Sequence, residues 1–176
     1  MSSVSGNAHT NNQTDVYVAA GSNVDAARNL RMAISSLQQV YAPLRLSPAY
    51  RNKAVGFSGD DFINLVVGFS TTDSVAEVRR QMQIVEARCG RPPDSPKWAP
   101  RTMDLDILLY GQQVSSEPGL VLPRPDLVKR PYMLKPMADI APHVVHPTLH
   151  KTMGELWQAF DAQGHEMVSV DLLLRG

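Results

Sequence analysis

Cysteine, surplus charge and long apolar runs are all scarce in this sequence, and each shortage argues against a class of protein. Cys89 is the single cysteine among 176 residues, which rules out internal disulfide bonds and predicts a reducing compartment, the cytoplasm. Lysine plus arginine and aspartate plus glutamate number 17 each, whereas a nucleic-acid-binding surface normally carries a basic excess. We therefore expect no nucleic-acid partner.

No stretch reaches the roughly 20 apolar residues of a membrane-spanning helix, and the N-terminus lacks an apolar signal segment. Residues 1–14 are instead rich in Ser, Asn and Gln, a composition typical of a flexible tail. The remaining residues, 15–176, have the length of one domain with its own core. We expect a single domain after a flexible tail, and no membrane partner.

The stretch 99–111 carries the strongest signal for chemistry. From Thr102 onward apolar residues alternate with others, which predicts a β-strand with one buried face. The residues expected on that buried face are Met103, Leu105, Ile107 and Leu109. Asp104 and Asp106 then share the other face, roughly 7 Å apart at their Cα atoms.

Two carboxylates at this spacing repel each other unless a cation lies between them. Magnesium prefers oxygen ligands, and it commonly takes one or two carboxylates together with substrate phosphates. Arg101, just before the strand, is placed to hold such phosphates. An ordinary solvent-facing strand with two aspartates is the alternative, although aspartate is depleted in strands. No G-x-x-x-x-G-K-[ST] sequence follows the first predicted strand, which argues against a P-loop enzyme.

Turn residues and hydrophobic spacing divide the domain into strands and helices. Strands are predicted at 15–20, 44–50, 61–71 and 102–110, and helices at 24–40 and 74–90. The second helix begins with a capping box, Ser74-x-x-Glu77. This order is that of the ferredoxin-like β-α-β-β-α-β fold, an α+β architecture with an antiparallel sheet and the helices on one face. Extra C-terminal elements are predicted as a helical turn at 136–140, a helix from Thr152 and an edge strand at 167–174.

The strand 61–71 should pack one apolar face on the helices, made of Ile63, Leu65, Val67 and Phe69. Phe62 and Asn64 then join the two aspartates on the opposite face, which later segments must wall to form a pocket. The amide of Asn64 needs partners at both ends, either backbone groups or a flat heterocycle. Residues 91–100 include four prolines, so we expect a loop there, placed to act as a lid.

Three histidines, at positions 143, 146 and 150, lie close together in the sequence. Pro142 and Pro147 interrupt any helix through this segment, so no two of the histidines can face one zinc ion from successive helical turns. We expect them to be surface residues.

Three stretches together resemble a known family: Tyr17–Asn23, Phe62–Asn64 and Trp98–Asp106, in order and spacing, are similar to 6-hydroxymethyl-7,8-dihydropterin pyrophosphokinases. The resemblance implies the ferredoxin-like fold. It also implies that the β,γ-diphosphate of ATP is transferred to the hydroxymethyl group of the pterin, leaving AMP, a step of folate biosynthesis. The implied partners are therefore two small molecules, ATP and the pterin, and we expect a monomer.

The resemblance also implies roles for individual residues. Asp104 and Asp106 would bind two Mg²⁺ ions, and Arg91 and Arg101 would hold phosphates, which makes these four the expected catalytic residues. The residues expected to bind the pterin are Phe62, Asn64, Tyr132, Val55 and Asp104. The residues expected to bind ATP are Gln83, Glu86, Trp98, Arg101, Ile107, Arg124 and Arg130.

The chain departs from the family pattern at several positions. Pro93 stands where the lid usually has a second basic residue, and Asp94 follows it. Arg124-Pro125 replaces a segment that usually begins with histidine, and 52–54 reads Asn-Lys-Ala where prolines are frequent. Two alternatives follow: a different metal-dependent phosphotransfer enzyme, or a non-catalytic or divergent nucleotide-binding module with the same fold.

Overall fold

The computed structural model describes residues 12–52, 61–90, 103–165 and 167–172. Its first part follows the predicted order: β1 (Thr14–Ser22), α1 (Ala26–Tyr41), β2 (Arg45–Leu46), β3 (Ala49–Asn52), β4 (Phe62–Thr71), α2 (Val75–Arg88) and β5 (Asp104–Tyr110). The later part adds β6 (Ser115–Glu117), β7 (Leu120–Leu122), the 3-10 helix η2 (Pro125–Val128), α3 (Pro131–Ile140), α4 (Met153–Gln158) and β8 (Val168–Val170). Most of the predicted tail, at 1–11, and the whole predicted lid, at 91–100, lie outside the described residues.

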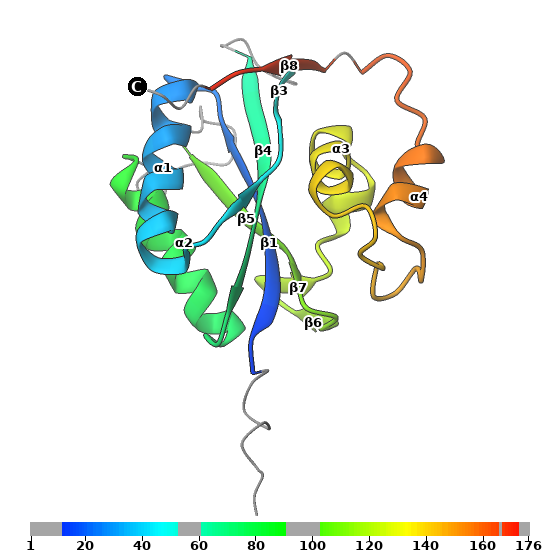
Figure 1. Ribbon diagram of the computed structural model, residues 1–176, viewed down its shortest axis with the longest axis horizontal. Coiled ribbons are helices and arrows are strands. Elements are labelled where there is room, and N and C mark those ends of the chain that lie inside the picture. Colours follow the sequence, from blue (N-terminus) through cyan, green and yellow to red (C-terminus); the bar gives the residue numbers. More distant parts are fainter. Residues whose placement is uncertain (1–11, 53–60, 91–102, 166, 173–176) are drawn as a thin grey trace, which may run out of the picture.

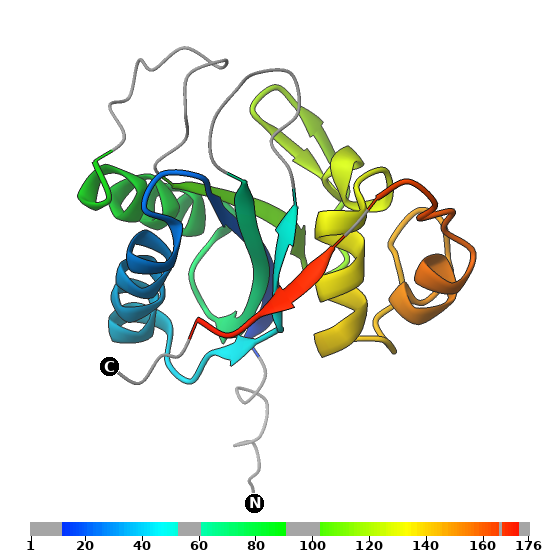
Figure 2. The same cartoon turned by 90° about the horizontal axis from the view of Figure 1, so that it is seen from above.

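Six of the strands form an antiparallel sheet in the order β5-β1-β4-β3-β8, with β2 also paired to β4, while β6 and β7 form a separate two-stranded hairpin. This is the ferredoxin-like arrangement, so the predicted fold is confirmed. The helices α1 and α2 cover one face of the sheet, while α3 and α4 lie on the other side (Figure 1). Figure 2 shows the same two layers of helices, one on each side of the sheet, from above. The C-terminal segments therefore wall the face that the first two helices leave open, as predicted.

Alternate residues of the central strands enter two different cores, because successive strand side chains point to opposite faces. The four apolar residues predicted to face the helices do so: Ile63, Leu65, Val67 and Phe69 pack in the core below α1 and α2. Val66, between two of them, packs instead in a second core with Leu134 and Met137 of α3. This second core fixes α3 over the open face.

The prediction for Leu109 was wrong, because β5 contains a bulge. Ile107 pairs with Val18, whereas Leu109 pairs with Tyr17, so Leu108 is an extra residue on β5. The bulge changes which face the following side chains occupy. Leu108 and Leu109 both pack in the second core, with α3, whereas Leu105 and Ile107 pack in the core below α1 and α2. The aspartates precede the bulge, and their predicted face is unaffected.

The prediction of a single strand at 44–50 is also wrong, because this segment forms two short strands, β2 and β3, on either side of Ser47-Pro48. Pro48 has no N–H to give to a ladder. Ser47 instead exchanges bonds with Val66 of β4: its N–H donates to the Val66 carbonyl at 2.9 Å, and its Oγ accepts from the Val66 N–H at 2.8 Å. The break separates β2 from β3, which forms one edge of the cleft described below.

Some of the remaining predictions are confirmed, and one is corrected. Both capping boxes form, with Ser74 and Thr152 as the N-caps of α2 and α4, and β8 is the predicted edge strand. The helical turn expected at 136–140 is part of a longer helix, α3, that begins at Pro131, a residue type favoured in the first helical turn.

The prediction that His146 is a surface residue is wrong, because this residue is only 4% exposed. Cys89 is buried at the end of α2, and burial raises the pKa of its thiol. None of the described helices combines the length and apolar character needed to cross a membrane.

Candidate functional site

A cavity of about 1210 Å³ lies over the open face of the sheet and continues around the β5 edge to α2, and we call it the cleft. The register explains its floor. On β1, Ala19 lies beside Asp106, and Gly21 lies between Asp104 on one side and Asn64 on the other. Small residues on the central strand therefore leave room between two rows of polar side chains.

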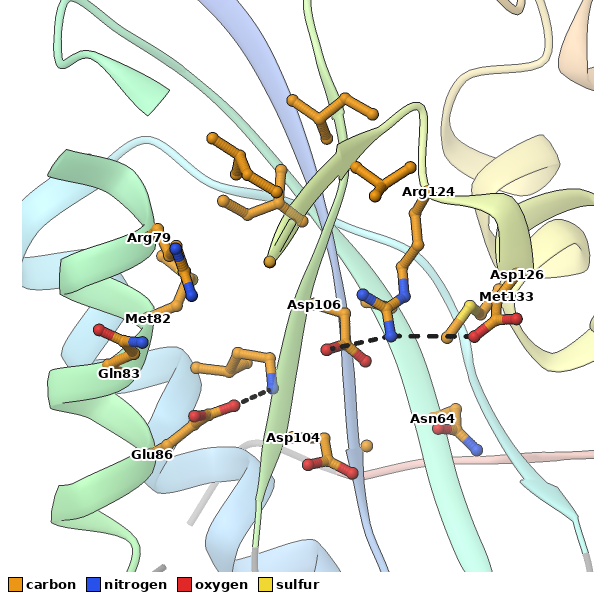
Figure 3. A pocket seen from close by; sticks show the side chains of 18 of the residues that line it. Asn64, Arg79, Met82, Gln83, Glu86, Asp104, Asp106, Arg124, Asp126 and Met133 are labelled. Carbon is orange, nitrogen blue, oxygen red and sulfur yellow. Dashed lines mark hydrogen bonds and ion pairs between the residues drawn. The ribbon is translucent and has the colours of Figure 1, made fainter. Parts of the chain in front are cut away.

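The walls of the cleft come from several elements around the aspartates. Gln83 and Glu86 line it from α2, on one side of the two aspartates, and Asn64 of β4 lies on the other side (Figure 3). The strand β7 and the start of η2 line a third side, and α3 contributes Tyr132. The cleft therefore has two sides, which we call the α2 side, with Gln83 and Glu86, and the β4 side, with Asn64. Asp104 and Asp106 lie between them.

Glu86 joins α2 to the aspartate strand. Its Oε2 accepts a hydrogen bond from the backbone N–H of Leu105 at 2.8 Å. Leu105 lies between Asp104 and Asp106, so this bond fixes the α2 wall relative to both carboxylates. Glu86, one helical turn after Gln83, therefore stabilises the structure in addition to lining the cleft.

Arg124 has the most unexpected position in the cleft. One guanidinium nitrogen, Nη2, lies 3.7 Å from Asp106 Oδ1 and 3.8 Å from Asp126 Oδ2 (Figure 3). Its backbone N–H donates to the carbonyl of Leu108 at 3.0 Å, so the β5 bulge holds this segment beside the aspartates. The side chain is 35% exposed, and its Nε is buried without a hydrogen-bond partner in the part of the chain that the structure describes.

The donor set fits magnesium better than zinc. Asp104 and Asp106 offer hard oxygen ligands on one face of β5, and both line the cleft. Among the described residues, no group of three or more His, Cys, Asp or Glu side chains could hold a metal ion. Magnesium does not need such a group, because one or two carboxylates plus substrate phosphates complete its shell.

Tyr132 stands close to this charged region. Burial raises the pKa of its phenol, the nearby carboxylates of Asp126 and Asp106 raise it further, and Arg130 and Arg124 oppose them. The phenol is therefore neutral at physiological pH, and its ring is available to contact a flat ligand in the cleft.

Most of the predicted site residues that can be seen meet in this cleft. They are Phe62, Asn64, Tyr132, Gln83, Glu86, Asp104, Asp106, Ile107 and Arg124. Arg130 is exposed at the start of α3 and does not line it. The predicted residues Val55, Arg91, Trp98 and Arg101, with the departures Pro93 and Asp94, lie outside the described residues.

The sequence reasoning missed Asn52 and Asp126, which also line the cleft. Asn52 was noted only as a departure from the family pattern. The pairing of β3 with β4 places Asn52 beside Phe62 and therefore on the same face, and this register comes from the structure. Asp126 likewise gave no signal, since η2 and the β5 bulge position it through tertiary structure.

Comparisons with known proteins show the family of this chain. The model of the family "7,8-dihydro-6-hydroxymethylpterin-pyrophosphokinase (HPPK)" matches residues 17–142. A 2-amino-4-hydroxy-6-hydroxymethyldihydropteridine pyrophosphokinase of Aquifex aeolicus is 35% identical over 142 residues, covering 80% of this chain and 88% of that protein. The protein of the same name from Synechocystis is 32% identical over 165 residues, covering 89% and 84%.

Solved structures give the same fold at much lower identity. The Plasmodium falciparum HPPK-DHPS triple mutant S436F/A437G/A613S with SDX-DHP has a TM-score of 0.68 at 12% identity, covering 83% of this chain. The wild-type protein with pterin and p-hydroxybenzoate has a TM-score of 0.66. The chain spans 41% and 43% of those two proteins. From the family match, the relatives and the cleft together, we conclude that this chain belongs to the 7,8-dihydro-6-hydroxymethylpterin-pyrophosphokinase family.

Proposed function

We propose that the cleft transfers the β,γ-diphosphate of ATP to the hydroxymethyl group of 6-hydroxymethyl-7,8-dihydropterin, with AMP as the other product, in folate biosynthesis. One observation carries the assignment of the site. Asp104 and Asp106 lie between the polar side of α2 and the β4 side with Asn64 (Figure 3). A reaction between two different substrates requires such a junction.

The β4 side suits the pterin. Phe62 and Tyr132 both line the cleft and are each partly buried, so they can contact the faces of a flat ring. Asn64 offers a donor and an acceptor to the edge of the ring. Val55, in the loop after β3, is assigned to the same half by family resemblance.

The α2 side suits the nucleotide. Gln83, Glu86 and Ile107 line it, and Arg124 adds a positive charge beside Asp106. Trp98, Arg101 and Arg130 are assigned here by family resemblance, and Arg91 and Arg101 would hold phosphates. An arginine suits this purpose because its guanidinium presents a fork of donors to phosphate oxygens.

Asp104 and Asp106 would hold two Mg²⁺ ions together with ATP oxygens, and the ions would supply neutralisation of phosphate charge. The chain's own residues then mainly position the reactants. Asn64 and the aromatic side chains hold the pterin, while Asp106 orients the hydroxyl group toward the diphosphate. No dedicated general base is evident beside that hydroxyl among the described residues, so orientation would contribute much of the rate.

The decisive experiment mixes the protein with Mg-ATP and the reduced hydroxymethylpterin and measures AMP. AMP with pterin diphosphate is expected. ADP would instead support a different phosphotransfer enzyme, and binding of ATP without turnover would support the non-catalytic module.

The first prediction tests the carboxylates. Asp104→Asn or Asp106→Asn removes one charged ligand, so turnover should fall on the order of 10²-fold or more. The thermal unfolding midpoint should change little, because apolar residues such as Leu105 hold the strand. Asp161→Asn, an exposed aspartate outside the cleft, is the matched control. Near-normal turnover in either cleft variant would contradict the metal assignment.

We also propose that residues 15–176 act as one monomeric domain in the cytoplasm. The single cysteine and the small-molecule substrates support this. Light scattering after size exclusion would test the oligomeric state.

A further inference from the structure

Asn64 is held at the nitrogen end of its amide by another asparagine. Its Nδ2 donates a hydrogen bond to Oδ1 of Asn52 at 2.7 Å. Asn52 is the last residue of β3 and pairs with Phe62, so its side chain shares the face that lines the cleft. The acceptor for Asn64 thus comes from the neighbouring strand and not from a loop.

The oxygen end of the same amide lies over a glycine. Gly21 is the direct partner of Asn64 in the pairing of β1 with β4. A Cβ atom at position 21 would overlap Asn64 Oδ1, so the amide oxygen occupies the space that any other residue would fill. Asn64 therefore has a donor end toward β3 and an acceptor end toward β1.

The orientation matters because the two ends of an asparagine amide have nearly the same shape but opposite hydrogen-bonding roles. A rotation of the amide by half a turn exchanges the donor and the acceptor. A ligand edge with a donor next to an acceptor is read correctly by only one orientation. The bond to Asn52 selects that orientation, and the space above Gly21 accommodates the oxygen end of the amide.

We propose that Asn52 is a positioning residue for the pterin, which fixes the amide of Asn64 in the orientation that reads the ring edge, with Gly21 leaving room for its oxygen. This inference rests on the proposed function, because it requires Asn64 to contact the pterin. Asn52 acts through Asn64, and the family resemblance assigned it no such role.

The test compares two substitutions at position 52. Asn52→Asp keeps an oxygen that accepts the bond from Asn64, whereas Asn52→Leu has a similar size and no acceptor. Calorimetry would measure the Kd of 6-hydroxymethyl-7,8-dihydropterin in the presence of Mg²⁺ and α,β-methylene-ATP, whose carbon bridge prevents transfer. We expect Asn52→Leu to raise this Kd roughly three- to tenfold, and Asn52→Asp to stay near the parent.

Two further measurements separate positioning from a general structural role. The Kd of Mg-α,β-methylene-ATP alone should not change in either variant, and the thermal unfolding midpoint should show that both fold. Arg51→Leu is the matched control, since Arg51 is exposed and precedes Asn52 on β3, where side chains alternate between faces. It should leave both dissociation constants at the parental values.

A double-mutant cycle with Asn64→Ala completes the design. In the Asn64→Ala background, Asn52→Leu should have no further effect on the pterin Kd, because the group that it positions is gone. The inference is overturned if Asn52→Leu binds pterin like the parent, if Asn52→Asp loses as much as Asn52→Leu, or if the effect persists without Asn64. If Asn64→Ala itself leaves the pterin Kd unchanged, the assignment of Asn64 in the proposed function fails instead.

Discussion

The Arg124 guanidinium lies between the carboxylates of Asp106 and Asp126, at distances typical of loose ion pairs. Both partners are partly buried, so solvent screens these pairs less than it would on an open surface. The family resemblance alone left Arg124 as a departure from the usual histidine. Its place in the cleft supports the hypothesis that it grips the triphosphate and compensates for Pro93 and Asp94 in the segment predicted to be a lid.

A substitution tests this hypothesis. Arg124→Ala should raise the Kd of Mg-ATP by about one to two orders of magnitude, because a charge-assisted contact is worth roughly 1.5–3 kcal/mol. Pterin affinity should change little. Lys129→Ala removes an exposed positive charge just after η2 and is the control. A calorimetric ATP titration of Arg124→Ala that matches the parent would refute the compensation.

At the scale of elements, the connection between α3 and α4 is organised around the buried His146. Its Nδ1 accepts hydrogen bonds from the backbone N–H groups of Thr148 (3.2 Å) and Leu149 (3.1 Å). The backbone N–H of His146 donates to the carbonyl of Lys151 at 2.8 Å. The imidazole must be unprotonated at Nδ1 to accept, and burial, with a smaller contribution from His150, lowers the pKa of His146 below its ordinary 6.5.

A pH dependence of stability follows. Between the lowered folded pKa and about 6.5, the unfolded chain binds a proton at His146 that the folded chain does not bind. The contribution of His146 is therefore fully present above about pH 6.5 and is lost as the pH falls. One such proton changes the free energy of unfolding by at most about 1.4 kcal/mol per pH unit.

Urea unfolding at pH 7.5 and 5.5 would measure this effect. His146→Asn keeps an oxygen that can accept both bonds but does not titrate, so the variant should lose less stability than the parent on acidification. His143→Asn, at an exposed position in the same connection, should behave like the parent. Equal losses in the parent and His146→Asn would exclude His146 as the titrating group.

At the scale of the whole molecule, the C-terminal strand β8 is the edge strand of the sheet, next to β3. β8 pairs with residues 49–51 of β3, and Leu172, just after it, is buried in the core below α1 and α2. Its carbonyl also accepts from Arg31 of α1 at 3.2 Å. The end of the described chain therefore connects α1 to the strand that carries Asn52.

Leu172→Ala should lower the free energy of unfolding by about 2–4 kcal/mol, since it removes a buried side chain and leaves a cavity. Denaturant unfolding would measure the loss. Val168→Ala is the control, because Val168 lies on β8, a few residues before Leu172, but is 58% exposed; its effect should stay within about 0.5 kcal/mol. A similar cost for both variants would mean that β8 stabilises the sheet by pairing alone.

The sequence by itself determined the β-α-β-β-α-β order of the first part of the domain, the helix starts at Ser74 and Thr152, and the face on which Asp104 and Asp106 lie. These features depend on local spacing and local hydrogen bonds, which are properties of neighbouring residues. The family resemblance added the chemistry and most of the cleft residues.

Only the tertiary structure decided the rest. The bulge at Leu108 depends on how β5 pairs with β1, and the burial of His146 depends on how its segment folds back between α3 and α4. Arg124 reaches Asp106 through that bulge, and Asn52 meets Asn64 through strand pairing. These contacts join residues that are distant in sequence, and their energies depend on packing that no local pattern encodes.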